Sequence, residues 1–156
     1  MDRFKKILVP IDGKRGSYNC LELACHIAVQ NDSEIHLLHV INLSMISKIA
    51  YLSDGNQDEM VEKSEKLATL YFKNFTNQIE EESGKKFKFQ KNIIKDESVD
   101  EAIINYAQDN DMDLIVIGLT SKKHATEVVV GHVTLRVVEF SQIPVLTLPT
   151  IKEKRW

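Results

Sequence analysis

The sequence contains little cysteine, proline or glycine: two, three and six residues, respectively, in a chain of 156. Cys20 and Cys25 both lie in one predicted helix, where their spacing points the two side chains in different directions. A disulfide between them is therefore sterically disfavoured. Two free thiols and no export signal favour a reducing compartment, and we expect a cytoplasmic protein.

Long apolar runs and a strong excess of one charge are also absent. No run approaches the ~18 apolar residues that a membrane-spanning helix needs, and Ile7–Ile11 is too short for the core of a signal peptide. Twenty Lys and Arg against 23 Asp and Glu give a net charge of −3, without the basic excess of a nucleic-acid-binding protein. We therefore expect neither a membrane nor a nucleic acid as a partner.

The apolar content is sufficient for one globular core. Hydrophobic residues make up 43% of the chain, and a domain of this size buries about 68–70% of its unfolded surface without needing disulfides or a structural metal. We expect residues 1–150 to form one domain and residues 151–156 to form a C-terminal tail.

Segments with strand and helix periodicity alternate along the chain. Apolar or alternating patterns predict strands at Ile7–Ile11, Glu34–Ile41, Phe87–Ile93, Leu114–Ile117 and Ile143–Pro149. Helical patterns predict a helix capped by Ser17, a helix over Asp58–Glu82 ended by Gly84, a helix from the capping box Ser98–Glu101, and a helix over Thr126–Phe140. Residues 42–57 have no clean period, and we interpret them as a long connection with room for a short helical turn.

This alternation predicts an α/β fold: a single-domain, doubly wound, five-stranded parallel sheet with helices on both faces. Ligands of such sheets bind beyond the carboxyl ends of the strands, where the strand order reverses. We therefore expect the chain after Ile11, Val40 and Ile117 to meet in one cleft.

The segment from Gly118 to His132 carries the most information about function. A glycine directly after a buried strand lets the backbone approach a ligand, and a following helix offers N–H groups to an anion. Together with Val-Pro-Ile-Asp in the first strand, Leu-Leu-His-Val in the second and Ile-Pro-Val-Leu near the end, this segment resembles the universal stress protein family. The resemblance runs from Lys6 to Pro149 and implies an adenine nucleotide alpha hydrolase-like fold.

The nucleotide-binding branch of that family has the pattern G-x2-G-x9-G-[S/T], which falls here on Gly118, Ser121, Gly131 and His132. The second glycine and the final hydroxyl residue are thus replaced. Ser121 has a Cβ, which is strained wherever φ must be positive. His132 either fills the space of a phosphate or, when protonated, contacts one.

The resemblance implies ATP or another adenine nucleotide as the ligand. The residues expected to bind it are Pro10, Ile11, Asp12, Val40, Ile117, Gly118, Ser121, Lys122, Gly131, His132 and Val133. Asp12 either contacts the nucleotide or caps the following turn. The run Lys122–His124 is either a phosphate patch or a solvated loop.

Patterns of catalysis and metal binding are missing. Gly13-Lys14 is followed by Arg15, so a phosphate-binding P-loop is excluded, and no serine lies in a G-x-S-x-G turn. His36 and His39 lie on opposite faces of one strand, so they cannot share a metal. Cys20, Cys25 and His26 lack the spacing of zinc ligands. We therefore expect no catalytic residue and no metal.

The resemblance implies a non-catalytic stress-response module. It also implies a homodimer, because the family's last strand pairs across a two-fold axis, and Ile143–Leu148 would be that strand. Three alternatives remain. The first is a module that has lost nucleotide and acts through its dimer surface and residues 42–57. The second is a weak ATP hydrolase that uses Asp12 with His132 or His124. The third is an interaction domain for a transporter or kinase partner, unknown from the sequence, that binds residues 42–57.

Overall fold

The computed structural model describes residues 3–119 and 131–149. Five parallel strands form one sheet in the order β3-β2-β1-β4-β5. The strands are β1 Lys6–Pro10, β2 Glu34–Asn42, β3 Lys88–Asp96, β4 Leu114–Gly118 and β5 Val145–Leu148. The predicted parallel α/β fold is confirmed, and β3 lies at an edge of the sheet, as its alternating pattern predicted.

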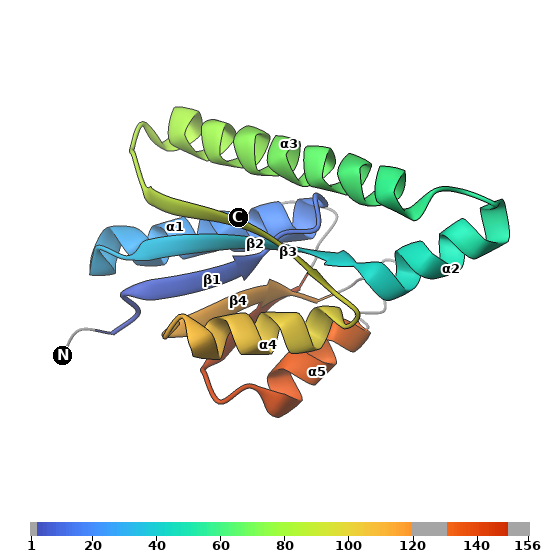
Figure 1. Cartoon of the computed structure of the whole chain (residues 1–156). Helices are drawn as coiled ribbons and strands as arrows, with labels where there is room; N and C mark the ends of the chain where they lie inside the picture. The colour runs from blue at the N-terminus through green and yellow to red at the C-terminus, as the bar shows by residue number, and fades with distance from the viewer. Residues whose placement is uncertain (1–2, 120–130, 150–156) are drawn as a thin grey trace.

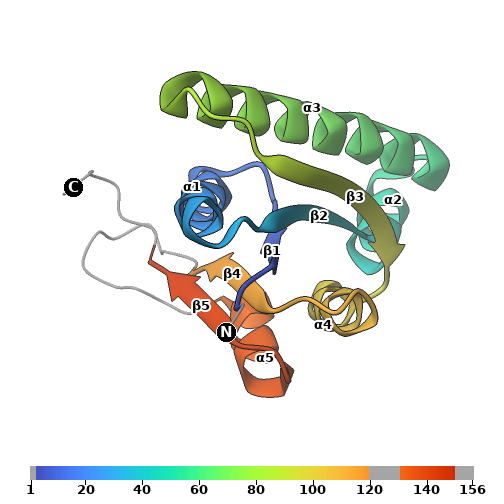
Figure 2. The same ribbon diagram turned by 90° about the vertical axis from the view of Figure 1, so that its left-hand side faces the viewer.

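Helices cover both faces of this sheet (Figures 1 and 2). α1 and α3 pack on one face, and α4 and α5 pack on the other. The helices are α1 Arg15–Asn31, α2 Leu43–Ser53, α3 Gln57–Ser83, α4 Val99–Asp109 and α5 His132–Phe140. Within the described residues, no helix is both long enough and apolar enough to cross a membrane.

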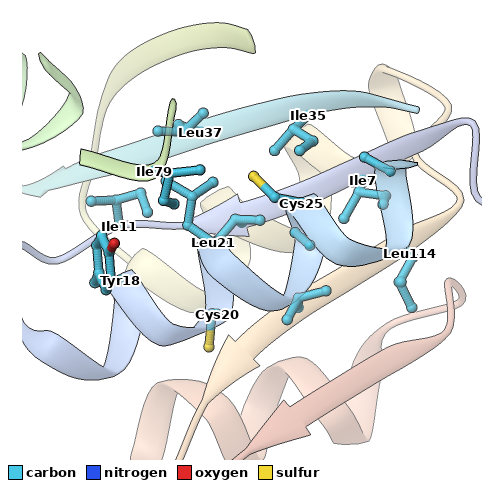
Figure 3. Close-up of a cluster of buried hydrophobic side chains, with 14 of the residues drawn as sticks. Ile7, Ile11, Tyr18, Cys20, Leu21, Cys25, Ile35, Leu37, Ile79 and Leu114 are labelled. Carbon is cyan, nitrogen blue, oxygen red and sulfur yellow. The ribbon is translucent and has the colours of Figure 1, made fainter. Parts of the chain in front are cut away.

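Successive side chains of the central strands point to opposite faces of the sheet, so the core has two layers. Ile7 and Val9 of β1 pack with α1 and α3, whereas Leu8 packs with α4 and α5. All three side chains are fully buried, because a parallel strand covered on both faces has no solvent-exposed side. Figure 3 shows Leu21 of α1 among the residues of the first layer.

The two cysteines belong to this core as free thiols. Their side chains leave α1 in different directions, with Cys25 on the side of Ile7 and Ile35 (Figure 3). Burial in apolar surroundings raises the pKa of Cys20 and the pKa of Cys25 to about 12. The absence of a disulfide between them agrees with the sequence.

The prediction that Ser17 caps α1 is wrong. The helix begins at Arg15 with Lys14 as its N-cap, and Ser17 lies in the first turn, where its Oγ donates to the Lys14 carbonyl at 2.9 Å. Gly13 adopts φ +82, which turns the chain sharply after β1 and lets the helix start earlier.

The interpretation of residues 42–57 as a long connection is also wrong. Eleven of these residues, Leu43–Ser53, form α2. The Asn42 side chain caps this helix by accepting from the Met45 N–H at 3.0 Å, and Asp54 ends it in a left-handed conformation. The helical period is hidden in the sequence because α2 carries apolar residues on its exposed side as well as its packed side.

The last helix starts later than predicted. Gly131 is its N-cap, in an extended conformation, and α5 runs from His132 to Phe140. The predicted helix began at Thr126, but residues 126–130 lie outside the described residues. The prediction is therefore wrong at Gly131, which precedes the helix instead of lying within it. Glycine has a low helix propensity, which favours its place at the boundary rather than inside the helix.

The capping box at Ser98 is confirmed only in part. Ser98 is the N-cap of α4, but its Oγ donates to Oδ1 of Asp100 at 2.8 Å, with no side-chain cap bond to the backbone. The Asp100 carboxylate also accepts from Arg136 of α5 at 3.5 Å. The start of α4 is therefore held by side-chain bonds that extend to a second helix.

Replacement of Leu21 by alanine tests the core layer under α1. Leu21 is 0% exposed and Leu52, on α2, is 82% exposed. We expect Leu21→Ala to lower the free energy of unfolding by about 2–5 kcal/mol, because it removes buried methyl groups and leaves a cavity. Leu52→Ala should change it by less than about 0.5 kcal/mol. Urea unfolding followed by circular dichroism measures both, and equal losses would contradict this packing.

Candidate functional site

A cleft lies at the carboxyl edge of the sheet, where β1, β2 and β4 end. Its volume is about 520 Å³, within the roughly 300–1,000 Å³ of small-molecule sites. The strand order reverses between β1 and β4, so this is the position at which doubly wound sheets bind ligands. The lining residues are Pro10, Ile11, Asp12, Lys14, Arg15, Gly16, Ser17, Leu38, His39, Val40, Val99, Ile103, Ile117, Gly118, Leu119, Val133 and Thr134.

The structure brings most of the predicted site residues together in this cleft. Those that line it are Pro10, Ile11, Asp12, Val40, Ile117, Gly118 and Val133. Gly131 and His132 directly precede Val133 at the start of α5, but they are not among the lining residues. Ser121 and Lys122 lie outside the described residues.

The cleft also contains residues that the sequence did not single out. Lys14 and Arg15 come from the start of α1, and Val99 and Ile103 come from α4. The sequence could have indicated Lys14 and Arg15, because they follow the first strand closely, where the cleft was expected. Val99 and Ile103 were recognised only as part of an apolar helix stripe, and nothing local showed that this stripe extends to the cleft.

The two ends of the cleft differ in chemistry. α4 packs on β2 and β3, so Val99 and Ile103 form an apolar end together with Val40. α1 packs on β1 and β4, so Lys14 and Arg15 lie toward the other end. There the Gly118 carbonyl accepts from Oγ1 of Thr134 at 2.8 Å, which ties α5 to the end of β4.

Asp12 shapes the turn between β1 and α1. Its Oδ1 accepts from the Lys14 N–H at 2.8 Å, and its own N–H donates to Oγ of Ser17 at 3.4 Å. Of the two interpretations of Asp12, the capping role is therefore present in the structure. This bond engages one carboxylate oxygen, and contact with a ligand through the other stays a prediction.

His39, a lining residue, and Tyr71, which lies outside the cleft, support the same turn. The Nδ1–H of His39 donates to the Ile11 carbonyl at 2.7 Å, and its ring meets the Tyr71 ring edge to face. Tyr71, from the middle of α3, also covers Gly13, where an added Cβ would lie 2.5 Å from the aromatic ring. The turn is thus held between its own hydrogen bonds and an aromatic side chain.

His36 occupies the other face of β2, as predicted. Its Nδ1 pairs with the Tyr106 hydroxyl at 2.7 Å, and its Nε2 pairs with the Glu34 carboxylate. Burial is the largest effect on Tyr106 and raises the pKa of that phenol. Within the ranges that the structure describes, no three His, Cys, Asp or Glu side chains are grouped as metal ligands.

A parallel sheet with helices on both faces and a cleft at its switch point defines a doubly wound α/β protein. The model of the universal stress protein family matches residues 3–149, and the chain belongs to that family.

Several relatives share nearly the full length. Universal stress protein YxiE of Bacillus subtilis is 28% identical over 148 residues, covering 92% of this chain and 97% of the relative. The solved structure of the hypothetical protein MJ0577 of Methanocaldococcus jannaschii has a TM-score of 0.78 at 26% identity and covers 97% of this chain and 99% of its own.

Two more distant structures contain nucleotides. One is the universal stress protein from Archaeoglobus fulgidus in complex with dAMP, with a TM-score of 0.63, 15% identity and coverage of 94% of this chain and 98% of its own. The other is a universal stress protein in complex with cAMP, with a TM-score of 0.67, 15% identity and coverage of 95% and 98%. At this identity the likeness shows the fold alone.

Replacement of Gly13 by alanine tests the support of the cleft turn. Gly13 has φ +82 and contacts Tyr71, whereas Gly84 has φ +67 and an added Cβ would meet nothing within 4 Å. We expect Gly84→Ala to cost about 1 kcal/mol of unfolding free energy for the left-handed backbone alone, and Gly13→Ala to cost about 1–3 kcal/mol more because of the ring.

The Tyr71→Ala background separates the two causes. Without the ring, the extra cost of Gly13→Ala over Gly84→Ala should largely disappear in urea unfolding. An equal cost of the two alanines in the wild-type background would show that Tyr71 does not constrain the turn.

Proposed function

We propose that this protein is a non-catalytic stress-response module that binds an adenine nucleotide, ATP among them, in the cleft. The observation that carries the proposal is the single cavity bordered by the ends of β1, β2 and β4, apolar at one end and cationic at the other. The dAMP and cAMP complexes of two family members support it. We place the protein in the cytoplasm, where its buried thiols stay reduced.

The chemistry of the two ends suggests how the nucleotide lies. The adenine base would occupy the apolar end beside Val40, Val99 and Ile103, where burial of a flat ring is favourable. The phosphates would lie toward Gly118, where the first turns of α1 and α5 direct backbone N–H groups outward. The contacts predicted for Ser121, Lys122, Gly131 and His132 stay predictions, because Ser121 and Lys122 lie outside the described residues and Gly131 and His132 precede the lining residue Val133 without lining the cleft.

The geometry favours binding over turnover. A hydrolase would need Asp12 with His132 or His124 beside the phosphates. Oδ1 of Asp12 is already bonded to the Lys14 N–H, and His132 is exposed at the start of α5 without lining the cleft. His124 lies outside the described residues. We therefore propose a binding module rather than an enzyme.

Calorimetry with ATP, ADP and AMP on nucleotide-stripped protein tests this function. A carboxylate introduced at the half-buried end of β2 by Val40→Glu should weaken nucleotide binding at least about tenfold, because it places a charge in the apolar end that would receive the adenine base. The control is Val29→Glu on α1, where the side chain is 51% exposed and outside the cleft.

Two outcomes would contradict the proposal. If the wild-type protein binds none of the three nucleotides, the interaction module without nucleotide becomes the better interpretation. If Val29→Glu weakens binding as much as Val40→Glu, the nucleotide binds elsewhere. Circular dichroism on both variants confirms that each remains folded.

We further propose that the protein is a homodimer through β5. This strand lies at the edge of the sheet beside α5 (Figure 2), and among the described residues it pairs only with β4. Leu146 of β5 is exposed, and so are Leu135, Val138 and Phe140 of α5. An unprotected edge with apolar neighbours favours pairing with a second chain.

Light scattering coupled to size exclusion tests the dimer. Leu146 is 37% exposed, and Leu146→Lys should convert a dimer to a monomer because two like charges would face each other across the two-fold axis. Leu52→Lys on α2 is the matched control and should leave the dimer intact. A monomeric wild-type protein, or a dimer unaffected by Leu146→Lys, would contradict the use of this edge.

A further inference from the structure

Two cations line the cleft at the beginning of α1. Lys14 is the N-cap of the helix and Arg15 its first residue, and both are exposed and border the cavity. Asp12 is the one carboxylate among the described lining residues, and the first turn of α1 contains no acidic residue. The cleft therefore carries a net positive charge at this end.

Neither of these two side chains forms an ion pair with a carboxylate in the part of the chain that the structure describes. Five other cations, Lys66, Lys86, Lys88, Lys95 and Arg136, each form an ion pair with Asp or Glu. Within residues 3–119 and 131–149, no such pair includes Lys14 or Arg15. Both cations are therefore available to an anion that enters the cleft.

Local contacts hold both residues in place. The backbone N–H of Lys14 donates to Oδ1 of Asp12, which fixes the direction in which the lysine leaves the turn. The Arg15 guanidinium lies over the Tyr18 ring, 4.9 Å from its centroid. Tyr18 packs against α3 and is not among the lining residues, so the guanidinium would exchange this contact for a ligand in the cleft, where its planar N–H groups match phosphate oxygens.

The position of these cations relative to the apolar end fits a long anionic ligand. Gly118 lies next to the first turn of α1, since a Cβ on Gly118 would be 3.7 Å from the Gly16 carbonyl oxygen. A nucleotide whose base lies by Val40 and whose phosphates pass Gly118 would direct its last phosphates toward Arg15.

We propose that Lys14 and Arg15 bind the terminal phosphates of a nucleoside polyphosphate, so that the cleft prefers triphosphate over monophosphate. This inference rests on the proposed nucleotide-binding function and adds the residues that set the preference. Charge-assisted bonds from both cations form only with the second and third phosphates, and the monophosphate does not reach them. Higher salt should therefore weaken ATP binding more than AMP binding.

The experiment is calorimetry of AMP, ADP and ATP with the wild-type chain, Lys14→Ala, Arg15→Ala and the double variant. We expect the double variant to lose about tenfold or more in ATP affinity and less than about twofold in AMP affinity, with ADP between them. Lys48→Ala, an exposed cation on α2 outside the cleft, is the control. Arg15→Lys keeps the charge without the planar guanidinium and should retain part of the ATP affinity; a loss as large as that of Arg15→Ala would show that the charge at this position does not bind phosphate.

The outcomes separate this inference from the function on which it rests. An equal loss of AMP and ATP affinity, or no loss of ATP affinity, would overturn the role of Lys14 and Arg15 while leaving nucleotide binding intact. If the wild-type protein binds no nucleotide, the proposed function fails, and inorganic tripolyphosphate then serves as the probe. Binding of tripolyphosphate that the double variant abolishes supports the two cations as a phosphate site, and no binding overturns it.

Discussion

Parallel pairing on both sides of β1 is the constraint that creates the cleft. β2 and β4 run beside β1 in the same direction, so the three strands end at one edge of the sheet. The helix that follows β1, α1, lies on one face of the sheet, and α5, the next described helix after β4, lies on the other. A cleft opens at such a point, where neighbouring strands connect to helices on opposite faces. The bond from the Ile11 N–H to the Leu38 carbonyl, at 2.8 Å, continues the pairing past β1 and fixes the border of that space.

The sequence predicted the sheet well, because a strand buried on both faces must be apolar throughout. β1 and β4 have that composition, and the alternating pattern of β3 correctly placed it at an edge. It failed at α2, where exposed Met45, Tyr51 and Leu52 obscure the helical period. The caps of α2, Asn42 and Asp54, were visible, but a cap is informative only beside a recognisable apolar stripe. Tertiary packing determines which apolar residues a short helix buries.

The cleft was predictable to the extent that it is built from strand ends. Asp12, Val40 and Gly118 each follow or end a buried strand, and parallel strands bring such positions together whatever the helices do. Lys14 and Ile103 belong to helices, and their place depends on where a helix starts and how it crosses the sheet. The support of the turn by Tyr71 joins residues far apart in the chain, and no local pattern indicates such a contact.

The buried cysteines limit how this member of a stress-response family can receive a signal. Peroxide and disulfides react with the thiolate, and a thiol whose pKa is about 12 is almost wholly protonated at neutral pH. Cys20 is fully buried, whereas Cys25 is 3% exposed and borders a surface pocket beside Glu22 and His26. The raised pKa values therefore slow the reaction of both thiols with peroxide, and of the two Cys25 is the one with a route to solvent.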